Sequence, residues 1–199
     1  MALYESNQKE LIKIENSDQL KLQNEFLTAE NEKLRELLDE SINSQEIFAR
    51  VLIDKDSPYL KSVVLNKGTK DKVKIGMAVI DDVYLVGQII EVNYSNSRAL
   101  LLSDLNSKIP SVLEPDDIQA VVSGTGGSFG TIEHTQIDYK DIFNNKEIIV
   151  YTSGLGGLFK PGIPIGKIDY SSDGQINFFS DFTQLNYVKI VSYKFGGEK

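Results

Sequence analysis

The uneven distribution of glycine and proline constrains the fold of this 199-residue chain more than any other feature. All fifteen glycines and all five prolines follow residue 57, beginning with Pro58 and Gly68. Both residues interrupt helices, so a long segment that lacks them, followed by one that is rich in them, predicts a helix leading into a β-structure with tight turns. We place the boundary between residues 45 and 46.

Residues 1–45 carry the pattern of a coiled-coil helix. Leu20, Leu27 and Leu34 recur every seven residues and would occupy d positions, which puts Asn24 and Asn31 at a positions. Asparagine at a is typical of parallel dimers, because it lowers stability but selects the register. The predicted dimer interface comprises Leu20, Asn24, Leu27, Glu30, Asn31, Leu34, Arg35 and Leu38. A single amphipathic helix packed on its own chain is the alternative, since only about three heptads are regular.

From residue 46 onward the sequence changes to short apolar runs separated by turn residues. They form two groups of six expected strands, the first from Phe48 to Leu113 and the second from Ile118 to Ser192. Many short strands at regular spacing favour sandwiches or small barrels over an alternating strand–helix fold. We therefore predict a first β-domain at 46–114 and a second at 115–199.

The overall charge and composition exclude several classes of protein. A net charge of −8 argues against binding to nucleic acid, which requires a basic face. Residues 1–45 contain five basic and ten acidic residues and so carry −5 of that charge. The absence of cysteine excludes disulfides and thiolate metal sites, and no apolar run approaches the ~18 residues of a membrane-spanning helix.

Motifs that could carry chemistry have structural explanations. The glycine-rich run at 124–130 lacks the lysine of a phosphate-binding loop, and strand-like sequence follows it, so we predict a hairpin. His134 is the only histidine and falls in the second strand group, where it cannot complete a protease triad or a metal site. We therefore expect a protein that is not an enzyme, with no catalytic residue, no metal and no cofactor.

The most distinctive stretch, Thr152–Ile168, packs five glycines and two prolines into seventeen residues. It resembles the sequence near the C-terminal end of the MreC family, the rod shape-determining proteins of the bacterial envelope. Further segments resemble the family in the same order along the chain: 66–68, 75–79, 84–89 and 97–104. Tyr84 and Gln88 stand where the family commonly has a glycine and a basic residue.

The resemblance implies a mainly β fold in which a long N-terminal helix forms a coiled-coil stalk, followed by two small six-stranded β-barrels. It also implies a single membrane-spanning anchor upstream of residue 1 in the cytoplasmic membrane, with this region in the periplasm. The family acts as a non-enzymatic scaffold of the cell-elongation complex, linking the MreB, MreD and RodA system to a penicillin-binding transpeptidase. Its members dimerise, and some form larger assemblies.

Two alternatives remain open from the residues. Leu155, Leu158 and Phe159 in the glycine-rich loop could bind a partner or could cover the end of a barrel. A periplasmic adaptor of an envelope transport or secretion system also joins a coiled coil to β-domains. Such adaptors use a helical hairpin, however, whereas this chain has one predicted helix without a returning partner.

Overall fold

The computed structural model describes residues 17, 19–30, 45–52, 61–135, 147–168 and 174–193, and the helical and β-regions form separate units. Residues 19–30 are helical and exposed, which confirms the predicted helix over that range. Pairing with a second copy stays a prediction, and four of its residues lie outside the described ranges: Asn31, Leu34, Arg35 and Leu38. No described helical segment is long and apolar enough to cross a membrane.

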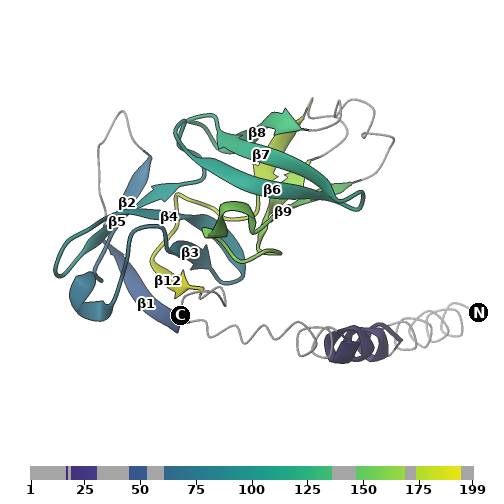
Figure 1. Cartoon of the computed structure of the whole chain (residues 1–199), viewed down its shortest axis with the longest axis horizontal. Helices are drawn as coiled ribbons and strands as arrows, with labels where there is room; N and C mark the ends of the chain where they lie inside the picture. The colour runs from purple at the N-terminus through teal and green to yellow at the C-terminus, as the bar shows by residue number, and fades with distance from the viewer. Residues whose placement is uncertain are drawn as a thin grey trace, which may run out of the picture. The chain divides into compact units, whose positions relative to one another are not determined.

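The strands of the described β-region form two closed antiparallel barrels of six strands each, as predicted (Figure 1). The first barrel has the order β1-β12-β3-β4-β5-β2. Its strands are β1 (Gln45–Leu52), β2 (Ser62–Leu65), β3 (Ala78–Asp81), β4 (Tyr84–Val92), β5 (Ser97–Leu101) and β12 (Tyr187–Ser192). The second barrel has the order β10-β11-β8-β7-β6-β9. Its strands are β6 (Lys108–Glu114), β7 (Ile118–Gly124), β8 (Phe129–Thr135), β9 (Ile148–Thr152), β10 (Pro164–Ile168) and β11 (Gln175–Phe178).

The predicted division at residues 114 and 115 is wrong, because the last strand belongs to the first barrel. β12 pairs with β1 from Gln45↔Ser192 to Arg50↔Tyr187 and with β3 on its other side. Figure 1 shows β12, in yellow, beside these two strands from the start of the β-region. Without β12, β1 and β3 would each present an unpaired edge, and closing the barrel satisfies both.

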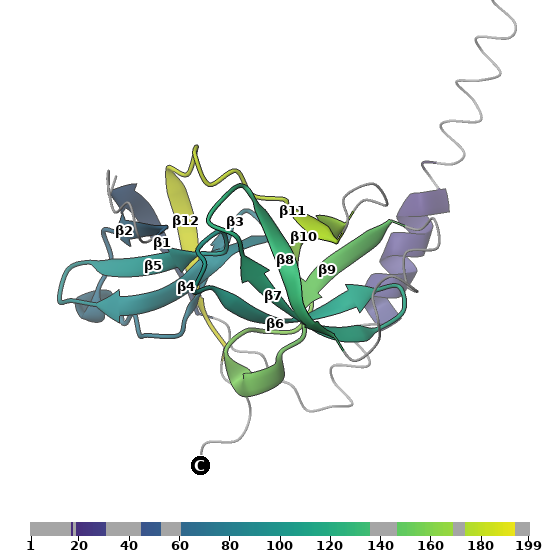
Figure 2. The same cartoon turned by 90° about the horizontal axis from the view of Figure 1, so that it is seen from above.

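The strand β6 was expected in the first domain and lies in the second barrel. It pairs with β7 from Lys108↔Ser123 to Leu113↔Ile118 and with β9 on its other edge. Figure 2 labels β10 and β11, which complete this barrel beside β9 and β8. The chain therefore crosses between the barrels twice, first through the connection 102–107 between β5 and β6 and then through 179–186 between β11 and β12.

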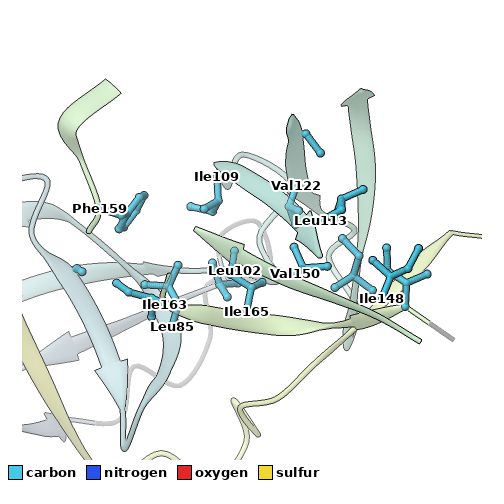
Figure 3. Packing of buried hydrophobic residues seen from close by; sticks show 14 of the residues in the cluster. Leu85, Leu102, Ile109, Leu113, Val122, Ile148, Val150, Phe159, Ile163 and Ile165 are labelled. Atoms are coloured by element: carbon cyan, nitrogen blue, oxygen red, sulfur yellow. The ribbon is translucent and has the colours of Figure 1, made fainter. Parts of the chain in front are cut away.

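The hydrophobic core of the second barrel extends into the first. Leu85 from β4 and Leu102 from the connection belong to the same buried cluster as Phe159, Ile163 and Ile165 of the second barrel. Figure 3 shows these side chains close together. A second cluster fills the first barrel and includes Leu65, Val86, Ile89 and Ile190. Because apolar area is buried at the shared cluster, the two barrels stabilise each other.

Candidate functional site

The glycine-rich loop between β9 and β10 is a series of tight turns, as its composition predicts. Gly154, Gly156, Gly157 and Gly162 all have positive φ, between 67° and 85°, a conformation that favours glycine. The base of the loop is fastened by Thr152, whose hydroxyl donates to the Lys160 carbonyl and accepts from the Ile163 amide. Its backbone carbonyl accepts from the Gly162 amide at 2.8 Å. Thr152 is fully buried, so the loop has a defined conformation rather than an open one.

The three apolar residues proposed for partner binding in this loop separate into two classes. Leu155 and Leu158 are 59% and 42% exposed, so they remain candidates for contact with a partner. Phe159 is 1% exposed and packs in the shared core, as Figure 3 shows. The inclusion of Phe159 in a partner-binding surface is therefore wrong: its ring covers the core beneath the loop.

The connection between β5 and β6 is organised by Asp104, which is 2% exposed. One carboxylate oxygen accepts the Lys61 amide at 2.6 Å, and the other accepts the Asn106 amide at 2.7 Å and its side-chain nitrogen at 3.0 Å. The sequence drew attention to segment 97–104 only through resemblance. A usable signal was present, since an aspartate that accepts the amide two residues later is a common turn former.

The end of β7 is pressed against this connection. At Gly124 the Cβ of any other residue would collide with the carbonyl oxygens of Leu102 and Asp104. The Gly126 amide donates to the Ser103 carbonyl at 2.8 Å, and the Gly124 amide donates to the Ser107 carbonyl at 3.3 Å. The glycine-rich run at 124–130 is thus a hairpin turn, as predicted, and its first glycine permits this close approach.

Charged side chains on the outside of the second barrel join neighbouring strands. Glu133 on β8 accepts from the Lys108 ammonium on β6 and from the Ser123 hydroxyl on β7, both at 2.6 Å. These two hydrogen bonds hold the pKa of the Glu133 carboxyl below its ordinary value of 4.5. His134 is exposed on the same strand. Within the described ranges, no group of three or more histidine, aspartate or glutamate side chains could hold a metal ion.

The family model for the barrel core of the rod shape-determining protein MreC matches residues 51–192, which include nearly all of both barrels. This chain belongs to the MreC family. The MreC from Haemophilus influenzae is 34% identical over 158 residues, covering 77% of this chain and 44% of that protein. The MreC from Bacillus subtilis is 30% identical over 216 residues, covering 95% of this chain and 72% of that protein. Both relatives are named cell shape-determining proteins, and this chain spans less than half the length of the first.

Solved structures of the MreC family have the same fold. A structure of MreC from Listeria monocytogenes is 25% identical with a TM-score of 0.72, covering 94% of this chain and 95% of that one. The crystal structure of MreC from Pseudomonas aeruginosa, 24% identical, has a TM-score of 0.62 and covers 74% of this chain and 99% of that one. The predicted resemblance is therefore confirmed, and the chain is assigned to this cell shape-determining family rather than to the periplasmic adaptors.

Proposed function

We propose that this chain is the extracytoplasmic part of a scaffold in the bacterial cell-elongation complex. In this role it binds a penicillin-binding transpeptidase and connects it to the MreB, MreD and RodA system. It acts by bringing partners together and has no chemistry of its own. An anchor upstream of residue 1 would hold it at the cytoplasmic membrane, with the barrels in the periplasm.

The observation that carries this proposal is the match to the family's barrel core, which includes nearly all of both barrels. Two features of the molecule support it further. The heptad leucines would bring two copies together and so present two sets of barrels to partners. Leu155 and Leu158 provide exposed apolar side chains on a loop whose base is held by the buried Thr152.

The test is capture of a penicillin-binding protein by residues 1–199. The tagged chain is immobilised, incubated with a bacterial envelope extract labelled with fluorescent penicillin, and washed. We expect a labelled band that free chain displaces by competition. A matched bait with Leu155→Ser and Leu158→Ser tests whether the exposed loop leucines contribute to capture.

A labelled band that appears equally on an unrelated acidic β-barrel would contradict the proposal, as would the absence of any band displaced by free chain. Analytical ultracentrifugation of the same preparation reports whether the bait is dimeric. If the chain is dimeric and still captures no penicillin-binding protein, the scaffold proposal fails, because the lack of a dimer cannot then explain the result.

A further inference from the structure

The outer face of the second barrel carries a pocket of about 500 Å³. Its floor is formed by Gln119, Val112 and Tyr151, which are cross-strand neighbours on β7, β6 and β9. The residues that alternate with them, such as Leu113 and Val150, point inward and are buried in the core. The three floor residues therefore face outward, yet each is only partly exposed.

One wall of the pocket comes from the glycine-rich loop. Pro161 and Gly162 line it beside Tyr151. The wall is held in place because the Gly162 amide donates to the Thr152 carbonyl at 2.8 Å. Gly154 has so little free space beside Pro161 that a Cβ there would contact the proline ring. The wall that the loop contributes is thus fixed by backbone interactions.

The pocket lining also carries two acidic residues. Glu114 and Asp117 lie in the pocket lining at the turn between β6 and β7. The described part of the chain supplies neither carboxylate with an ion pair or a hydrogen bond. The Gln119 Oε1 atom is buried, so a molecule in the pocket does not reach it, and the two carboxylates are the acceptors that the lining offers to a ligand cation.

We propose that this pocket binds the guanidinium group of an arginine side chain from a partner protein. A guanidinium offers five N–H donors in a planar arrangement, which suits the two carboxylates of the pocket lining. The aliphatic part of the side chain would lie along Val112 and Pro161, and the Tyr151 ring favours a nearby cation. The proposal rests on the proposed function only in naming a protein as the source of the arginine.

Two other cations fit the pocket less well. A lysine ammonium presents three donors from a single point and is more strongly hydrated, so it would lose more than a guanidinium on leaving water for a partly apolar pocket. A calcium ion takes six to eight oxygen ligands, whereas much of this lining is the apolar surface of Val112, Tyr151 and Pro161. Arginine is therefore the ligand that the lining favours.

The experiment titrates the isotope-labelled chain with N-acetyl-arginine amide and follows backbone amide signals by NMR. We expect saturable shifts at Gln119, Tyr151 and Gly162. N-acetyl-citrulline amide, which has nearly the same shape without the charge, should bind about tenfold more weakly or less. The chain with Glu114→Gln and Asp117→Asn should lose the arginine response. Asparagine tolerates the left-handed backbone at 117, where φ is 52°, so this variant keeps its fold.

Asp116→Asn is the matched control, since it changes one charge in the same turn at a residue outside the pocket lining. It should retain arginine binding. The proposal is overturned if citrulline or lysine derivatives match arginine, if the shifts do not saturate, or if calcium ions alone shift the same amides saturably. This result is independent of transpeptidase capture: arginine binding without capture would reject the scaffold proposal and leave the pocket assignment standing.

Discussion

The carboxylate of Asp104 and the backbone amide of Lys61 are joined by a 2.6 Å hydrogen bond, although 43 residues separate them in the chain. Lys61 precedes β2 of the first barrel, and Asp104 lies in the connection that leads to β6 of the second. The same carboxylate also accepts two hydrogen bonds from Asn106. One buried side chain therefore fastens the connection from β5 to β6 to the residue that precedes β2.

Replacing this carboxylate should destabilise the protein. Asp104→Ala removes three hydrogen bonds and leaves the Lys61 amide without its acceptor, so we expect a loss of about 3 kcal/mol in the free energy of unfolding. Asp104→Asn keeps one acceptor oxygen, so its free energy of unfolding should fall by less than that of Asp104→Ala. Urea denaturation followed by circular dichroism measures both values, and equal stability of Asp104→Ala and the parent chain would contradict the role of this residue.

The close approach at Gly124 gives a steric prediction. Gly124→Ala places a methyl group against the Leu102 and Asp104 carbonyls, and relieving that clash should cost about 3 kcal/mol. Gly127→Ala in the same hairpin is the control, because its nearest neighbour would lie at 3.5 Å, an ordinary contact. We expect the thermal midpoint to fall markedly for Gly124→Ala and to stay nearly constant for Gly127→Ala. Similar midpoints for the two variants would refute the steric explanation.

The glycine-rich loop should separate into a structural and an exposed part. Phe159→Ala removes a buried ring from the shared core and should lower the free energy of unfolding by about 3–5 kcal/mol. Leu155→Ala changes a largely exposed side chain and should alter it by less than about 0.5 kcal/mol. Chemical denaturation of both variants tests this division. Tolerance of Phe159→Ala would mean that the core beneath the loop is not closed by the ring.

The contribution of Glu133 to the stability of the folded protein should depend on pH. Its folded pKa lies below the 4.5 expected when unfolded, because the carboxylate accepts from Lys108 and Ser123. The stabilisation is therefore fully present above pH 4.5 and is lost as the pH falls through the lower folded pKa. The difference in thermal midpoint between the parent chain and Glu133→Gln should be present at neutral pH and should disappear in acid. A difference between the two thermal midpoints that grows as the pH falls would contradict this prediction.

The helix should mediate dimerisation through its heptad leucines. Leu27→Ala together with Leu34→Ala should weaken the predicted dimer without unfolding the barrels, since these residues would occupy d positions of the coiled coil. Leu22→Ala is the matched control: Leu22 is exposed on the same helix but falls at an f position. Sedimentation equilibrium measures the dimer constant, and circular dichroism follows the β-signal. A parallel loss of β-structure would contradict the prediction, because it would mean that the barrels depend on the helix.

Local sequence was sufficient to predict the order of a helix followed by short strands, and the tight turns at 124–130 and 154–162. These features depend on neighbouring residues: glycine permits positive φ, and alternating apolar residues define a strand wherever they occur. The family resemblance at Thr152–Ile168 could also be recognised, because the turns need glycine and proline at particular positions.

The tertiary structure alone decided which strands belong together and what particular side chains do. β12 closes the first barrel because β1 and β3 both need a partner, a requirement that strand order along the chain does not reveal. Phe159 is a core residue because it packs in the cluster that residues of both barrels share, and Gln119 faces a pocket because β6 and β9 bring Val112 and Tyr151 beside it. Pairing, burial and pockets arise from contacts between distant residues, so no local pattern could specify them.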